Sequence, residues 1–243
     1  MDLLHSYLAD ERARIENLRI VGVTKEETPE VYDTFMEYTT KAYASEKSPL
    51  ELSFIPIHPG DILSYGGYHF EVKLLKGHTF GQCGLYEPEK KLMFVGDQLM
   101  TTIVPIVGTQ ETDLGMLKCY LDSLGDLKHN YKDCYFLPCH YGEIRNVEKE
   151  VNRIILGYLE KCEIMKHVLE EAGTALTTRD IGVRTYGRSQ GPPDYAHFAS
   201  CTYIWAKTFS CMEYMMGEGF VERSERDGII YWKAPSIHFE NNR

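Results

Sequence analysis

The chain has 243 residues and a mass of 28.0 kDa, enough for one large domain or two modest ones, and we expect two. Apolar residues make up 43% of the chain and aromatic residues 12%, a content that excludes a disordered protein. The formal net charge of −10 disfavours broad non-specific binding to nucleic acid.

Cysteine usage and the N-terminal residues bear on where the protein works. Seven cysteines fall at no regular spacing, and the first residues lack a basic stretch followed by an apolar one. We therefore expect a cytoplasmic protein with reduced thiols. Asp97 and Pro105 interrupt the longest apolar run, residues 92–108, which falls short of the ~20 apolar residues of a membrane span. We expect no membrane segment.

Residues 1–47 are charged and helical in pattern. Thr28 followed by Pro29 predicts the start of a second helix, and we expect both helices of this segment to lie at the periphery. The helical pattern runs from Met1 without a capping residue in front of it, so we expect a truncated start.

Residues 52–96 change to short β-like runs separated by glycine and proline turn signals, which predicts a meander in one sheet. The expected strands are LSFIPI, DILSY, YHFEVKLL, QCGLYE and KLMFVG. Leucines at helical spacing predict a helix over 113–127, and CYFLPC predicts a short buried strand from Cys134 to Pro138.

The pattern changes again near position 147, where we place a boundary between domains 1–146 and 147–243. The expected elements are a long helix over 147–172 ended by Gly173, a short helix capped by Thr177 or Thr178, an aromatic-rich helix over 195–216, and a hairpin that turns at Arg226-Asp227-Gly228. Three helices followed by a hairpin is the order of a winged helix-turn-helix unit.

Three short loops each carry a candidate metal ligand directly after an expected strand: His78, Asp97 and His140. Glycines flank these positions, and a glycine-flanked loop lets the backbone crowd a central ion. Imidazole and carboxylate suit Zn²⁺ or Fe²⁺. Each residue alone is more simply a satisfied loop residue, whereas the ordered set of three predicts a metal site.

The motifs GHTFGQ, FVGD and PCHYGE resemble, in this order, the second half of the metallo-β-lactamase fold superfamily. The resemblance covers residues 52–235 and implies an α/β fold, a partial αββα sandwich followed by an α+β winged helix. It implies that His78 belongs to a first metal site, that Asp97 bridges two metals, and that His140 belongs to the second site. The tail is similar to the C-terminal domain of β-lactamase-like protein 2 and related bacterial hydrolases.

The chain departs from the family in lacking its leading signature, H-x-H-x-D-H; His5 does not have the paired spacing. With Asp97 shared, each metal keeps two protein ligands, below the three that catalytic zinc sites normally use. We therefore expect weak metal binding or none, and an open sheet edge exposed to aggregation. An internal start or a gene fragment is the favoured explanation, and a degenerate, non-catalytic relative is the alternative.

The resemblance implies a metal-dependent hydrolase in which metal-bound hydroxide attacks a small-molecule ester, thioester or phosphodiester. Zn²⁺ is the expected cofactor, two ions per site, with Fe²⁺ or Mn²⁺ as alternatives. We name no catalytic side chain beyond the ligands, because the aspartate that would orient the hydroxide belongs to the absent motif. The alternatives are a metal-free pseudoenzyme and an endoribonuclease in which Arg179, Arg184 and Arg188 line a cleft.

Two further features have a plain structural interpretation. Cys139, beside His140, is expected to be an inert buried thiol rather than a ligand or nucleophile. Aromatic residues of the last long helix recur at near-helical spacing and predict core packing, with a substrate lid or a homodimer face as the alternative: Tyr195, Phe198, Tyr203, Trp205 and Phe209. Lys207 is the one basic residue in 194–217, which disfavours DNA binding.

Overall fold

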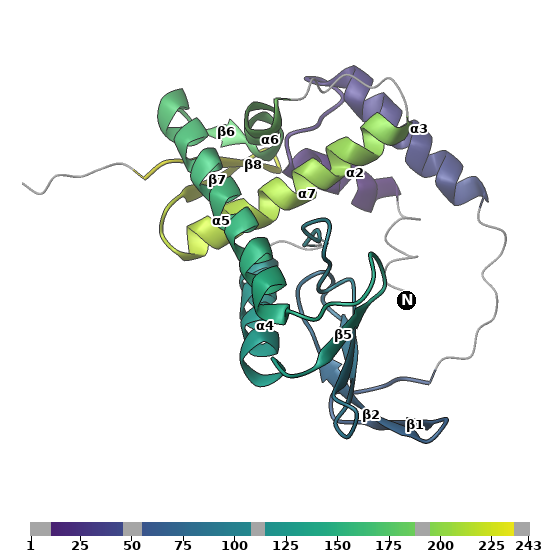
Figure 1. Ribbon diagram of the computed structural model, residues 1–243. Coiled ribbons are helices and arrows are strands. Elements are labelled where there is room, and N and C mark those ends of the chain that lie inside the picture. Colours follow the sequence, from purple (N-terminus) through teal and green to yellow (C-terminus); the bar gives the residue numbers. More distant parts are fainter. Residues whose placement is uncertain (1–10, 46–54, 108–114, 188–194, 236–243) are drawn as a thin grey trace, which may run out of the picture. The chain divides into compact units, whose positions relative to one another are not determined.

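The structure is a computed structural model that describes residues 11–45, 55–107, 115–187 and 195–235 (Figure 1). The chain divides into two compact units, one formed by residues 53–161 and the other by residues 1–52 together with 162–243. These bounds differ from the boundary expected at 146/147, because helix α5 (Val147–Ala172) runs unbroken past residue 161 and the N-terminal helices pack with the C-terminal segment. The assignment of evolutionary domains stays a prediction.

The unit of residues 53–161 is built on a five-stranded sheet. Its strands, in both chain order and spatial order, are β1 (Ile62–Tyr65), β2 (Tyr68–Leu74), β3 (Cys83–Glu87), β4 (Leu92–Gly96) and β5 (Tyr135–Pro138). Neighbouring strands are antiparallel except for β4 and β5, which are parallel. The expected meander is therefore present over residues 62–96.

The first expected strand, LSFIPI, is wrong over its described part. Residues 55–57 lie in no strand, and the side chain of Ile55 is 88% exposed. Pro56 offers no N–H group to a neighbouring strand, which explains why β-forming isoleucines on either side of it do not pair. Residues 52–54 lie outside the described part of the chain.

One face of this sheet is covered and the other is partly exposed, since Val72, on the same face as Phe94, is fully buried. Met93 and Phe136 are fully buried on the covered side, and the connection between the parallel strands β4 and β5 contains helix α4 (Met116–Asn130). Phe94 and Tyr135 point to the other side and are each 40% exposed. This partly exposed face is aromatic, since Phe70 and Phe94 meet edge to face with ring centroids 5.7 Å apart.

The second unit contains the remaining elements. They are α2 (Glu11–Ile20), α3 (Pro29–Ser45), the end of α5, β6 (Leu176–Thr177), α6 (Thr178–Tyr186), α7 (Tyr195–Gly217), β7 (Glu222–Arg226) and β8 (Ile229–Lys233). The three strands form a sheet in the order β6-β8-β7. The expected order of helices and hairpin is present. Thr177 caps α6 by accepting a 3.1 Å hydrogen bond from the Asp180 N–H. Asp227 and Gly228 adopt the positive φ angles of a tight hairpin turn.

The N-terminal helices pack by one face against α7, and Leu18 is the one fully buried residue among their described side chains. Leu18 and Val23 form a buried cluster with Trp205 of α7, and the Val21 carbonyl accepts a 2.9 Å hydrogen bond from the Arg179 N–H. Burial of this apolar surface explains why the charged α2 and α3 stay with the second unit.

Core packing is confirmed for two aromatic residues of α7. Trp205 and Phe209 are buried, whereas Tyr203 is 56% exposed because a residue two positions away points to the far side of a helix. The structure does not describe the side chains of Tyr195 and Phe198, so their part of the prediction stays a prediction. No helix in the described ranges is long and apolar enough to cross a bilayer.

Candidate metal centre

The three predicted ligands follow strands that end at the same edge of the five-stranded sheet. Strand β2 runs antiparallel to β3 and β3 runs antiparallel to β4, so β2 and β4 point the same way, and β5 is parallel to β4. The loops that carry His78, Asp97 and His140 leave these three strands at their C-terminal ends. The topology therefore brings together residues that are far apart in the chain.

The two histidines lie on either side of the Asp97 carboxylate. The His78 Nε2 atom is 3.7 Å from Asp97 Oδ2, and the His140 Nε2 atom is 3.5 Å from Asp97 Oδ1. The structure thus brings all three residues together as two pairs that share one carboxylate. Their role as metal ligands stays a prediction.

The orientation of His78 is fixed from behind by a backbone group. Its Nδ1 atom lies 2.7 Å from the carbonyl oxygen of Ile106. A carbonyl oxygen can only accept a hydrogen bond, so the proton of the neutral ring resides on Nδ1 and Nε2 presents a lone pair toward Asp97. A histidine that binds a metal is typically held in this way.

Asp97 contains a polar atom for which the described residues offer no donor. Its Oδ1 atom is buried and makes no hydrogen bond, an arrangement that costs free energy for a charged oxygen. The lone pair of His78 Nε2 and the Asp97 carboxylate therefore face each other with no proton between them, and His140 Nε2 lies on the other side of that carboxylate. A divalent cation fits this acceptor set, because two ligands at about 2.1 Å from a tetrahedral ion lie about 3.4 Å apart.

The fit is to two pairs of ligands rather than to one larger cluster. Nowhere in the described ranges do three or more His, Cys, Asp or Glu side chains gather closely enough to hold one ion. Asp97 is the one candidate ligand that lies near both His78 and His140 in the described part of the chain. The described residues accordingly offer two protein ligands to each metal position.

Two glycines allow close approaches at this site, Gly77 to helix α4 and Gly96 to the loop that carries His78. Gly77 has a φ of +148°, and a side chain there would collide with Tyr120 of α4. Gly96 has a φ of +57°, and a side chain there would collide with the Gln82 amide. The Gly96 carbonyl also accepts a 3.1 Å hydrogen bond from the Cys139 N–H, which ties the Asp97 loop to the His140 loop.

Sequence reasoning missed Gln98, which is fully buried beside Asp97. Its Nε2 atom donates to the Lys76 carbonyl at 3.1 Å and to Ser123 Oγ at 3.0 Å, and its Oε1 atom accepts from the His78 N–H at 3.4 Å. One amide thus links the His78 loop to helix α4. The available signal was an amide residue directly after Asp97 inside the apolar run of residues 92–108.

Helix α4 also supports Gln98 through Tyr120. The Tyr120 hydroxyl donates a 2.8 Å hydrogen bond to the Gln98 carbonyl. Burial raises the pKa of Tyr120, so the hydroxyl keeps its proton and remains a donor across the physiological range.

Cys139 is exposed, so the expectation of a buried thiol is wrong. The reason is local: the side chain leaves the sheet at the end of β5, just before the loop of His140. Of the arginines proposed for an RNA cleft, Arg179 pairs with Asp180 at 3.2 Å, Arg184 is exposed on α6, and Arg188 lies outside the described residues.

Comparisons with solved structures identify the fold. A metallo-β-lactamase family protein of Thermus thermophilus superposes with a TM-score of 0.70 at 20% sequence identity, over 95% of this chain and 68% of that one. A β-lactamase domain protein of Burkholderia ambifaria superposes with a TM-score of 0.68 at 19% identity, over 84% of this chain. The chain has a metallo-β-lactamase-like fold.

Sequence comparison adds a short match. A stretch of 40 residues is 50% identical to the hydroxyacylglutathione hydrolase GloC of Haemophilus influenzae. This stretch covers 16% of this chain and 19% of that protein. The chain spans 59% of the Burkholderia structure. No family sequence model matches the chain.

Proposed function

We propose that the protein is a metal-dependent hydrolase of the metallo-β-lactamase superfamily that acts on a small-molecule thioester, ester or phosphodiester. The observation that carries the proposal is the Asp97 carboxylate, with its buried Oδ1 atom lacking a donor and a histidine Nε2 atom facing each oxygen. The short match to a hydroxyacylglutathione hydrolase favours a thioester among the three substrate classes.

His78 and Asp97 would hold one ion, and His140 and Asp97 would hold the other. Bound ions would act as Lewis acids on the substrate oxygen and lower the pKa of a coordinated water toward neutrality. The nitrogen and oxygen donors suit Zn²⁺, with Fe²⁺ and Mn²⁺ as alternatives. Since the described residues offer two ligands to each ion, we expect zinc to bind more weakly than in a three-ligand site.

Side chains next to the ligands are suited to contact the substrate. Phe80 and Tyr141 follow His78 and His140 closely in the chain and are 53% and 54% exposed. Exposed aromatic rings beside a polar centre favour an organic substrate with apolar groups. We assign them to substrate contact rather than to chemistry.

The proposal extends to the second unit and to the cell compartment. We assign the elements from the end of α5 to β8 to a winged helix like that of β-lactamase-like protein 2, on the strength of their order and the β6-β8-β7 sheet. The free thiols of six described cysteines are in keeping with a cytoplasmic protein.

The test is zinc binding and thioester hydrolysis by the full chain, first stripped of metal with a chelator. Zinc should bind and should switch on hydrolysis of a hydroxyacyl thioester of glutathione, and Asp97→Asn should lose both. Asp61→Asn is the matched control, because Asp61 also faces a histidine, His58, at 3.6 Å but on the open surface. Absence of zinc binding would contradict the proposal.

Zinc binding without turnover of any of the three substrate classes would instead favour the non-catalytic alternative. Zinc-dependent cleavage of RNA, lost in Asp97→Asn, would favour the endoribonuclease alternative. Either result would replace the small-molecule hydrolase as the proposed function.

A further inference from the structure

Helix α5 makes polar contacts to the loop that supports the proposed metal ligands. This loop follows β4 and is described over residues 97–107; we call it the β4 loop. It contains Asp97, it supplies the Ile106 carbonyl to His78, and its Leu99 and Val107 side chains are fully buried. It lies in the unit of residues 53–161, as does the first part of α5.

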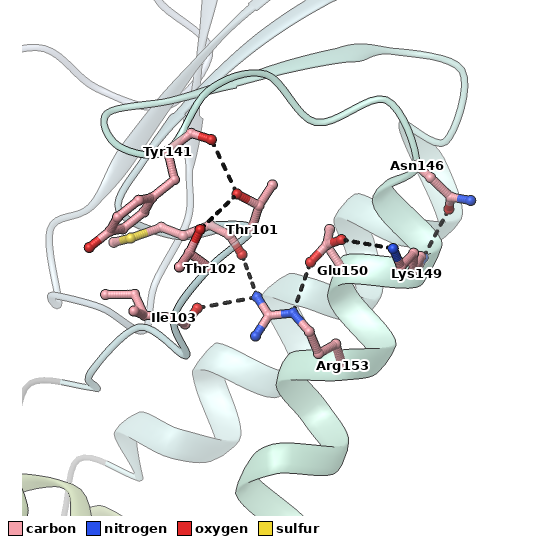
Figure 2. Close-up of polar contacts among 9 residues, drawn as sticks. Thr101, Thr102, Ile103, Tyr141, Asn146, Lys149, Glu150 and Arg153 are labelled. Atoms are coloured by element: carbon pink, nitrogen blue, oxygen red, sulfur yellow. Dashed lines mark hydrogen bonds and ion pairs between the residues drawn. The ribbon is translucent and has the colours of Figure 1, made fainter.

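Arg153 of α5 binds the first half of the β4 loop. Its Nη2 atom donates to the carbonyl oxygens of Met100 at 2.6 Å and Ile103 at 3.2 Å, as Figure 2 shows for the guanidinium group and Ile103. Its Nε atom donates to Glu150 Oε2 at 2.8 Å, which holds the guanidinium plane in place. One charged group therefore fixes two backbone carbonyls.

The same half of the loop reaches the backbone next to His140. The Thr101 hydroxyl donates a 3.2 Å hydrogen bond to the Tyr141 carbonyl (Figure 2). Tyr141 has a φ of +67°, a left-handed conformation that is unfavourable for a tyrosine and needs support from its surroundings. Arg153 and Thr101 thus connect α5 to the His140 loop.

Tyr158 of α5 binds the second half of the β4 loop. Its hydroxyl donates to the Pro105 carbonyl at 2.6 Å and accepts from the Val107 N–H at 3.1 Å, so it spans the residue between them. That residue is Ile106, whose carbonyl holds the His78 ring. Tyr158 is fully buried, and its ring packs edge to face against Tyr120.

We propose that Arg153 and Tyr158 are positioning residues that hold the β4 loop, so that Ile106 keeps His78 in the Nδ1-protonated form and Thr101 supports the backbone beside His140. Neither residue touches a reacting group in this account; both act through backbone carbonyls. The inference bears on metal binding and in that respect rests on the proposed function.

The first test measures the His78 ring directly in the metal-free full chain, by long-range ¹H–¹⁵N NMR at a pH where the imidazole is neutral. The wild-type protein should show His78 protonated at Nδ1 alone. Tyr158→Phe keeps the ring packing but removes both hydroxyl contacts, so His78 should become a mixture of the two tautomers. The exposed His58 in the same spectrum should not change.

Metal affinity is the second readout. We expect Tyr158→Phe and Arg153→Lys each to weaken zinc binding about tenfold, as is usual when a group that orients a metal ligand is removed. Lysine keeps the charge of Arg153 but cannot bind both carbonyls and Glu150 with one planar group. Tyr86→Phe is the matched control, since within the described part of the chain the Tyr86 hydroxyl makes no hydrogen bond to the β4 loop.

A single Nδ1 tautomer in folded Tyr158→Phe, with unchanged zinc affinity in both variants, would overturn the inference. Thermal melting shows whether Tyr158→Phe is folded, and Arg153→Lys supplies a second test if it is not. The tautomer is measured without metal or substrate, so a protein that binds zinc but hydrolyses nothing would contradict the proposed function and leave this inference standing.

Discussion

The His78 ring and the Ile106 carbonyl group, 28 positions apart in the chain, are joined by a hydrogen bond of 2.7 Å. This bond leaves the Nε2 atom of His78 unprotonated and facing Asp97, whose Oδ1 atom is buried without a donor. Acceptors that converge without protons repel one another, so the arrangement favours a cation at the centre. Zinc binding, loop support and stability should therefore be linked.

Zinc should raise the melting temperature of the full chain, and Asp97→Asn should abolish the rise. A ligand that binds only the folded state, present at 100 times its Kd, stabilises that state by about 2.7 kcal/mol. Differential scanning calorimetry with and without excess zinc measures the effect. His58→Gln should behave as wild type, because His58 lies on the surface. Equal rises in wild type and Asp97→Asn would show that zinc binds elsewhere.

Gln98→Leu should lower the free energy of unfolding by about 1–3 kcal/mol, since it leaves the Lys76 carbonyl and the Ser123 hydroxyl without their buried amide partner. Urea unfolding followed by circular dichroism measures the change. Asn130→Ala on the surface end of α4 removes only an exposed hydrogen bond and should change stability by less than about 0.5 kcal/mol. A neutral Gln98→Leu would contradict the structural role given to this amide.

Two glycine-to-alanine substitutions should change the stability of the protein in opposite directions. Gly96→Ala should destabilise the protein by about 1–2 kcal/mol, because φ is +57° there and the new methyl group meets Gln82. Gly125→Ala should stabilise it by about 0.5–1 kcal/mol, because Gly125 lies inside α4 with open space around it. Thermal melts of both variants compare the two positions. A rise in melting temperature for Gly96→Ala as well would argue against the loop conformation described for Gly96.

The exposed aromatic side chains on one face of the five-stranded sheet should promote self-association. Replacing Phe94 and Tyr65, which are 40% and 84% exposed, with lysine should reduce it, because charge opposes the burial of apolar surface between copies. Sedimentation velocity over a range of concentrations follows the change. Leu156→Lys, at an exposed leucine of α5 in the same unit, should have little effect. If all variants associate alike, another surface is responsible.

Strand order and glycine positions made the convergence of His78, Asp97 and His140 predictable. Each residue lies within four positions of the end of a strand, and strands that point the same way end at one edge. Gly77 and Gly96 marked close approaches to helix α4 and to the loop that carries His78, and the structure gives both of them positive φ angles. These signals are local in the sequence, so they can be read without knowledge of the packing.

Contacts through backbone carbonyls were not predictable. Ile106, Met100 and Ile103 use only main-chain oxygens, so their side chains carry no sign of the role. Leu18 and Val23 are apolar, which predicts burial but not the residue against which they pack. Their packing against Trp205 depends on the tertiary fold.

The measurement that tests the central claim most directly is a crystal structure of the full chain soaked in zinc, with anomalous diffraction at the zinc absorption edge. We predict two anomalous peaks, one beside His78 Nε2 and one beside His140 Nε2, each about 2.0–2.2 Å from an oxygen of Asp97. Zinc peaks elsewhere only, or protonated histidines hydrogen-bonded directly to Asp97 with no zinc between them, would contradict it.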